Sequence, residues 1–226
     1  MMLESNLTFS ENRLIEKAYI ITMLDNNISL DLAKRCLKSC EDKGQNAVFW
    51  PAFEGTKNGI KVPKFLSRQD WVSWIKVPSN LYSNSQIACF FSHVSLWAYC
   101  AKTDKPLIIL EHDAICSSPL REHGFYNCIQ YLGNREQKNG RHMTTIPPHA
   151  SMFDARWRSL CRAHAYAIDP SIARNLLSYV IREGMTKTLD MFIRADIFAM
   201  IQNGIYFYDE PGVSTIAEPE NSNGDK

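Results

Sequence analysis

The chain has 226 residues and a formal net charge of +1 at pH 7. Hydrophobic residues make up 45% and charged residues 22% of the sequence, a composition that is typical of a globular protein and excludes a disordered chain. The near-neutral charge also excludes a protein that overall charge drives onto nucleic acid or a membrane surface, although it leaves a local basic patch open.

Two further features of the sequence concern its compartment. No apolar run approaches the roughly 18 residues that a membrane span needs, and residues 1–13 lack the apolar core of a signal peptide. The 7 cysteines form no Cys-x-x-Cys pair and sit mostly among apolar residues, as reduced core thiols do. We therefore expect a cytoplasmic protein without a transmembrane segment.

The first part of the chain predicts a strand, a helix and a second strand. Residues 18–24 form an apolar run typical of a buried strand. Ser29 can then cap a helix over residues 30–43, and residues 47–53 have the pattern of another strand. A strand, helix and strand within so short a stretch favour a parallel sheet.

The middle of the chain combines an irregular segment with two strongly apolar elements. Residues 56–82 contain Trp71 and Trp74 and show no clear period, so we expect a long loop or lid there. A helix over residues 85–102 is apolar nearly all round and should be buried, and residues 106–110 form a short apolar strand.

Later elements complete an α/β pattern. They are expected as a strand at 163–168, a helix begun by Pro170 after the cap Asp169, a helix at 189–201, a strand at 205–208 and a polar tail at 217–226. The sequence thus predicts one α/β domain over residues 1–216, with a mixed, mostly parallel sheet flanked by helices.

The segment Glu111-His112-Asp113 is the clearest candidate for chemistry, because it follows the buried strand 106–110. Carboxylates at i and i+2 of an extended segment point to the same side, and open α/β sheets bind ligands at strand ends. Two such oxygen donors suit Mg²⁺ or Mn²⁺ bound with a substrate phosphate. A solvated loop explains the same residues without any metal.

Other candidates have equally plain structural explanations. Asp190 can be a general base or simply a helix cap, and His93 lies in the most apolar helix, where a hydrogen-bonded core histidine is the default. Residues 135–164 are locally basic, and Arg156 and Arg158 can grip a phosphate or form a solvated face.

Together these segments resemble glycosyltransferase family 25. Residues 86–97 (QIACFFSHVSLW) followed by 106–114 (PLIILEHDA) are similar to its helix with the pattern Glu-x-Gly-Cys-x-x-Ser-His-x-x-x-Trp and its strand ending Leu-Glu-Asp-Asp. Residues 51–55 resemble its early turn, and residues 165–177 its tyrosine strand and following helix. The similarity covers roughly residues 17–216.

The resemblance implies a GT-A fold, a nucleotide-sugar donor that we expect to be UDP-linked, a divalent cation and inversion at the anomeric carbon. It implies that Glu111 and Asp113 are metal ligands and that Asp190 is the catalytic base. Glu111 would also contact the donor. We also expect His93, Thr22, Arg156 and Arg158 to contact the donor.

The sequence departs from the family pattern at four positions. Gln86 and Ala88 stand where the family has Glu and Gly, His112 replaces the central Asp of the acidic motif, and Thr22 stands where Asn is usual. A glycan such as lipooligosaccharide is the favoured acceptor. A hydroxylated DNA base as acceptor, or a non-catalytic relative that only binds nucleotide sugars or glycans, remain the alternatives.

Overall fold

The computed structural model describes residues 15, 17–66, 71–78, 80–120, 127–133, 135–136, 142–143, 160, 163–201 and 204–209. Its elements in chain order are β1 (Ala18–Thr22), α1 (Asn27–Asp42), β2 (Ala47–Pro51), β3 (Glu54–Thr56), β4 (Gly59–Lys61), the 3₁₀ turn η1 (Lys64–Leu66), α2 (Trp71–Trp74), α3 (Asn84–Thr103), β5 (Leu107–Glu111), β6 (Ala114–Cys116), β7 (Ile129–Tyr131), β8 (Arg135–Glu136), β9 (His142–Met143), β10 (Ala165–Ile168), α5 (Pro170–Glu183), α6 (Leu189–Phe192), β11 (Met200–Ile201) and β12 (Phe207–Asp209).

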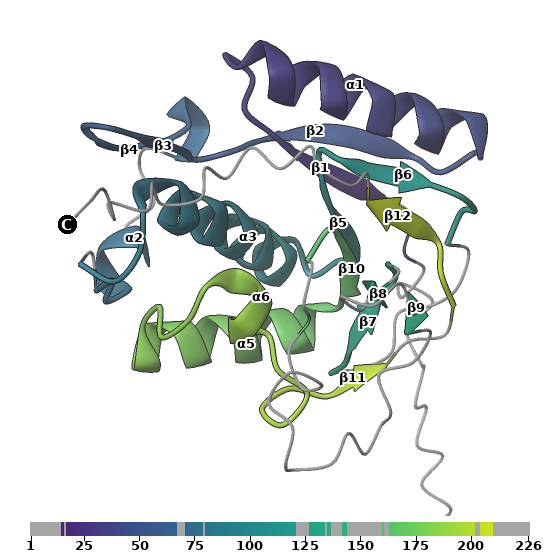
Figure 1. The fold of residues 1–226 in the computed structure, drawn as a ribbon. Coiled ribbons are helices and arrows are strands. Elements are labelled where there is room, and N and C mark those ends of the chain that lie inside the picture. The colour runs from purple at the N-terminus through teal and green to yellow at the C-terminus, as the bar shows by residue number, and fades with distance from the viewer. Residues whose placement is uncertain are drawn as a thin grey trace, which may run out of the picture.

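A six-stranded sheet in the order β11-β7-β10-β5-β1-β2 forms the centre of the fold (Figure 1). β1 is parallel to both β2 and β5, and β11 is parallel to β7, whereas β10 runs antiparallel to β5 and β7. β1 and β5 are buried almost throughout, which explains their continuous apolar runs. The predicted mixed, mostly parallel sheet with flanking helices is confirmed.

Helices cover both faces of this sheet, and successive residues of β1 point to opposite faces. Ile20 belongs to a core cluster with Cys36 of α1, and we call this side the α1 face. Tyr19 belongs to the larger cluster with Trp97 of α3 and Leu176 of α5, and we call this side the α3 face. Figure 1 shows α1 and α3 on opposite sides of β1.

The helix α3 begins with a capping box that explains one departure from the family pattern. Ser83 Oγ accepts a hydrogen bond from the Gln86 amide at 3.2 Å, and Gln86 Oε1 accepts one from the Ser83 amide at 3.0 Å. Either Gln or Glu makes this reciprocal contact. Gln86 therefore preserves the helix start that a glutamate would supply.

The start of α1 differs from the prediction by a few residues. Asn26 is the cap, because its Oδ1 accepts from the Ser29 amide at 3.0 Å. The Ser29 hydroxyl instead accepts from the Met23 amide at 3.0 Å and is buried. Ser29 therefore ties the end of β1 to the first turn of the helix.

The long loop expected over residues 56–82 is wrong in part, because the structure has short elements there. The strands β3 and β4 form a hairpin, followed by η1 and α2. Gly55 lets the hairpin approach α3, since a Cβ at this position would lie 2.3 Å from the Ser85 amide nitrogen. Trp74 of α2 has 59% of its surface exposed, so its predicted contact with a sugar stays a prediction.

The helix expected over residues 189–201 is also wrong. α6 ends at Phe192, and Met200 and Ile201 pair in parallel with β7. Pairing with a strand some 70 residues earlier overrides the local helical pattern. The strand expected at 205–208 is present as β12, and the predicted tail at 217–226 lies outside the described residues.

Two other expectations concern the compartment. Within the described part of the chain, no helix combines the length and apolar character that crossing a bilayer requires. The six described cysteines are all free thiols, in keeping with the reduced cysteines expected from the sequence.

Candidate active site

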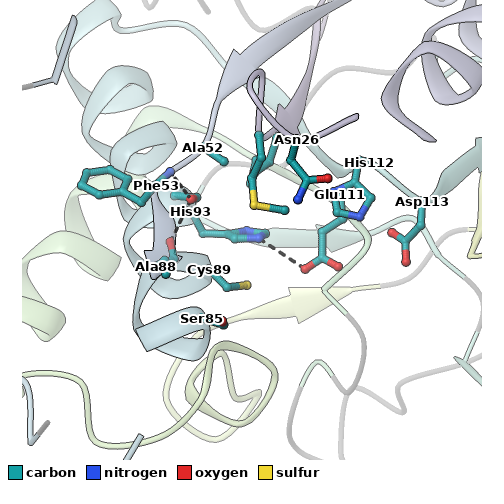
Figure 2. A pocket seen from close by; sticks show the side chains of 14 residues that line it. Asn26, Ala52, Phe53, Ser85, Ala88, Cys89, His93, Glu111, His112 and Asp113 are labelled. Atoms are coloured by element: carbon teal, nitrogen blue, oxygen red, sulfur yellow. Dashed lines mark hydrogen bonds and ion pairs between the residues drawn. The ribbon is translucent and has the colours of Figure 1, made fainter. Parts of the chain in front are cut away.

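A pocket opens at the carboxyl ends of β1 and β5, beside the first turns of α3 (Figure 2). Its walls come from the end of β1, the residues before α1, the segment after β2, the first half of α3 and the end of β5. Parallel strands of open α/β sheets place their ligands at this edge. His93, Glu111 and Asp113, three of the residues predicted for the site, all line the pocket.

Glu111 is the last residue of β5 and faces His93 across the pocket. The distance from His93 Nε2 to Glu111 Oε1 is 3.4 Å, and 27% of the Glu111 side chain remains exposed. Burial, reinforced by the negative charges of Asp190 and Asp209, raises the pKa of Glu111 to about 8. Burial lowers the pKa of His93 to about 3, so its imidazole is neutral at neutral pH.

A hydrogen-bonded network behind the pocket holds His93. Its Nδ1 lies 2.8 Å from the Tyr166 hydroxyl, which also accepts from Trp97 Nε1 at 3.0 Å. The rings of His93 and Tyr166 stack with an interplanar angle of 9°. The family pattern's His, Trp and Tyr positions are thus direct neighbours, and His93 is both a core histidine that is hydrogen-bonded through Nδ1 and part of the pocket wall.

Asp113 lies in the turn between β5 and β6, so the segment 111–113 is not extended as the sequence suggested. Burial and the charge of Glu111 raise the pKa of Asp113 to about 7. Its buried Oδ1 atom has no hydrogen-bond partner within the described residues. Glu111 and Asp113 both have raised pKa values, and one oxygen of Asp113 has no hydrogen-bond partner within the described residues. Two such carboxylates fit the donor set of a hard divalent cation.

His112 points toward α1 rather than joining the two carboxylates. Its Nδ1 lies 3.2 Å from the Ser29 hydroxyl. Burial lowers the pKa of His112 to about 4, so this residue brings no positive charge to the altered acidic motif at neutral pH. The contact instead joins the end of β5 to the first turn of α1.

Asp190 stands in the first turn of α6, but it does not act as that helix's cap. Its Oδ1 accepts a hydrogen bond from the Ala163 amide at 2.9 Å, just before β10. Its charge nevertheless adds to the raised pKa values of Glu111 and Cys89, which burial mainly causes, and partly offsets the lowering of the His93 pKa by burial. Asp190 therefore lies near the carboxylates without forming the pocket wall.

The other residues predicted to contact the donor are Thr22, Arg156 and Arg158. Thr22 is fully buried, and its hydroxyl donates to the Ile20 carbonyl of its own strand at 2.8 Å. The pocket wall contains its neighbours Ile21 and Met23 instead. Arg156 and Arg158 lie outside the described residues. A donor-binding role for these three residues stays a prediction.

Two residues near the site were not assigned from the sequence. Asp209 of β12 pairs with Ala114 next to the acidic turn, and its charge raises the pKa of both Glu111 and Asp113. No local pattern marks Asp209, because only the antiparallel pairing of β12 with β6 brings it there. Cys89 lines the pocket one helical turn before His93, a spacing that was visible in the sequence.

A comparison with protein families adds a further finding. The family model described as glycosyltransferase family 25 (LPS biosynthesis protein) matches residues 27–193. The match covers well over half of the chain and runs from α1 through α6, so it includes the acidic turn and Asp190. No curated protein sequence matched the chain.

Proposed function

This chain belongs to glycosyltransferase family 25, and we propose that it transfers a sugar from a UDP-linked donor to a hydroxyl group of a lipopolysaccharide-type glycan. Family membership supports the general activity, with a sugar donor and a glycan acceptor. The observation that carries the finer proposal is the pair of partly buried carboxylates, Glu111 and Asp113, at the carboxyl edge of the sheet.

In this proposal Glu111 and Asp113 hold Mn²⁺ or Mg²⁺. Burial, reinforced by neighbouring negative charge, raises the pKa of both side chains, and a bound cation would favour their ionised forms. When bound by these two residues, such an ion would offset the negative charge that develops on the donor diphosphate. Carboxylate oxygens suit these hard cations better than thiols or imidazoles do.

We further propose that Asp190 is the base of an inverting reaction. The acceptor hydroxyl attacks the anomeric carbon, its proton passes to a carboxylate, and the nucleotide leaves from the opposite side. Oδ1 of Asp190 is fixed by the Ala163 amide, which orients the second oxygen, Oδ2. A base that is held by one oxygen can accept the proton with the other. His93 and Glu111 would line the donor's side of the pocket.

The experiment is a thermal shift with UDP, GDP, CDP and UDP-sugars, each with and without Mn²⁺. A ligand at about 100 times its Kd adds about 2.7 kcal/mol to the unfolding free energy. For a chain of this size each kcal/mol raises the Tm by roughly 2–4 °C, so the ligand should raise the Tm by several degrees. We expect a shift that requires UDP and Mn²⁺ together.

Two variants make this experiment specific. Asp113→Asn should lose the Mn²⁺-dependent shift, whereas Asp31→Asn, an acid on α1 whose side chain is 75% exposed, should retain it. A shift that persists in Asp113→Asn would refute the metal assignment, and no shift with any nucleotide would favour a relative that has lost donor binding.

A further inference from the structure

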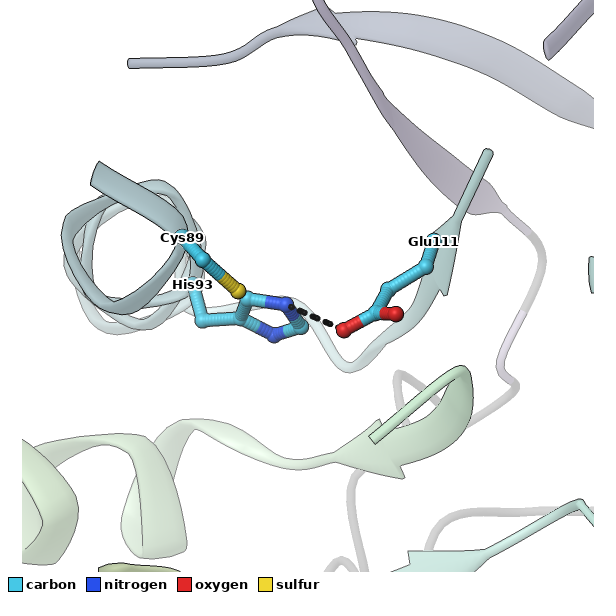
Figure 3. A group of neighbouring side chains, drawn as sticks. All are labelled: Cys89, His93 and Glu111. Atoms are coloured by element: carbon cyan, nitrogen blue, oxygen red, sulfur yellow. Dashed lines mark ion pairs between the residues drawn. The ribbon is translucent and has the colours of Figure 1, made fainter. Parts of the chain in front are cut away.

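A second set of potential metal ligands faces the same pocket from the side of α3 (Figure 3). Cys89 and His93 are four residues apart, so they lie on one face of the helix, and Glu111 approaches them from the end of β5. One ligand atom from each of Cys89, His93 and Glu111 lies within 4.8 Å of the other two. Asp113 is not part of this group.

The spacing of two of these atoms matches the edge of a tetrahedral zinc site. A Zn–N distance of about 2.0–2.1 Å and a Zn–O distance of about 2.0–2.2 Å place tetrahedral N and O ligands about 3.4 Å apart. His93 Nε2 and Glu111 Oε1 are 3.4 Å apart. This distance exceeds the usual N–H···O range of about 2.7–3.2 Å, and the buried Nε2 has no hydrogen-bond partner in the described part of the chain.

The far side of the His93 ring is held as a metal-bound histidine requires. Its Nδ1 lies 2.8 Å from the Tyr166 hydroxyl, which also accepts from Trp97. With the proton on Nδ1, the hydroxyl accepts from both residues, and Nε2 presents its lone pair to Glu111. A partner on the second ring nitrogen fixes the orientation and tautomer of a ligating histidine.

We infer that Cys89, His93 and Glu111 form a binding site for Zn²⁺, distinct from the hard-cation pair Glu111 and Asp113. Thiolate and imidazole ligands favour Zn²⁺ over Mg²⁺ or Mn²⁺. On binding, the Cys89 thiol releases its proton to solvent and its sulfur coordinates the ion. Three protein ligands leave the fourth position to water or another oxygen from the open side of the pocket.

The two cation sites share Glu111, so a zinc ion would withdraw one ligand from the Mn²⁺ or Mg²⁺ position. Only this competition rests on the proposed function. The zinc site itself depends on Cys89, His93 and Glu111 and does not require the protein to bind a nucleotide. A failure to bind UDP with Mn²⁺ would therefore leave the zinc inference standing, and a failure to bind zinc would leave the transferase proposal standing.

The test uses Co²⁺ as a spectroscopic substitute for Zn²⁺ in the full-length, metal-free protein without nucleotide. Thiolate coordination gives a sulfur-to-cobalt charge-transfer band, and Zn²⁺ affinity follows from displacement of that band. The matched control is Cys40→Ser. Cys40 lies in the core of the α1 face, where it interacts with Cys36 and Cys116, and those thiols form the main competing explanation.

We expect wild type and Cys40→Ser to show the band and to release Co²⁺ to Zn²⁺. Cys89→Ser should lose the band, and its Zn²⁺ affinity should fall by more than about 100-fold. Tyr166→Phe removes only the hydrogen bond to His93, so its Zn²⁺ affinity should fall less, by roughly 10–100-fold. A band that survives in Cys89→Ser, a band that disappears in Cys40→Ser, or no zinc uptake by wild type would each overturn the inference.

A second ligand variant guards against misfolding of Cys89→Ser. Glu111→Gln keeps the size of the side chain and removes its negative charge, so it should weaken Zn²⁺ binding while leaving the unliganded fold intact by circular dichroism. If folded Glu111→Gln binds Zn²⁺ as tightly as wild type, the three-ligand site is wrong.

Discussion

The two faces of the central sheet differ in how their buried side chains are held. On the α1 face, Cys36, Cys40 and Leu110 pack in an apolar cluster, which stabilises the fold mainly by burial. On the α3 face, His93 and Tyr166 are fully buried polar groups that require directed hydrogen bonds. Stability is the main contribution of the first face, while the second also fixes the wall of the pocket.

Asp113→Ala should have the largest effect on turnover and a small effect on stability, so it separates the function of the pocket from the stability of the fold. If Asp113 holds the cation, its removal costs several kcal/mol of transition-state stabilisation, so turnover should fall on the order of 10³-fold or more. Its buried oxygen lacks a partner in the described residues, so the fold should lose little stability. Transferase assays and urea denaturation check the two parts, and retained turnover would contradict the metal assignment.

Asp190→Asn should lower transfer by about 10²–10⁴-fold, the usual contribution of a general base. The amide oxygen of Asn can still accept from the Ala163 amide, as Asp190 Oδ1 does now. Donor binding, measured by the UDP-dependent thermal shift, should therefore persist. If donor binding disappears together with transfer, Asp190 is a donor contact and not the base.

Leu110→Ala tests the α1 face at a position three residues before Asp113. Leu110 is fully buried in the α1-face cluster, so its truncation should cost about 2–5 kcal/mol of unfolding free energy. The UDP- and Mn²⁺-dependent thermal shift of the folded variant should remain. A normal unfolding free energy with a lost shift would show that the two faces are not separable in this way.

The pH dependence of stability gives the smallest expected effect. Burial holds the pKa of Asp113 at about 7 and that of Glu111 at about 8, above their unfolded values of 3.8 and 4.5. Below pH 4 both states bind these protons. Between these limits only the folded chain keeps them, so the metal-free unfolding free energy falls as the pH rises from about 4 and levels off above pH 7–8.

Asp113→Asn isolates this effect because Asn carries no titrating proton. Relative to wild type, the variant should gain on the order of 1–3 kcal/mol between acidic and mildly alkaline pH, after allowance for partial solvent screening. Urea denaturation in chelator-treated buffer measures the difference. A wild-type-to-variant gap that does not change with pH would contradict the raised pKa of Asp113.

Several parts of the fold were predictable because their signals are local. The Asp169 side chain accepts from the Ser171 and Ile172 amides, and Pro170 follows as the first helical residue, as the sequence indicated. The apolar runs of β1 and β5 likewise predicted buried strands. Residues 189–201 were mispredicted because Asp190 bonds to a distant amide and β11 pairs with β7, and neither partner is visible in the local pattern.

The candidate site shows the same division between local and distant information. The sequence by itself determined the buried strand that precedes Glu111, the two carboxylates after it and the helical spacing of Cys89 and His93, because each depends on neighbouring residues. Only the tertiary structure decided that Glu111 faces His93, that Tyr166 supports the imidazole, and that the charge of Asp209 acts on the acidic turn. These contacts arise from sheet pairing and burial between segments far apart in the chain, which local sequence patterns do not encode.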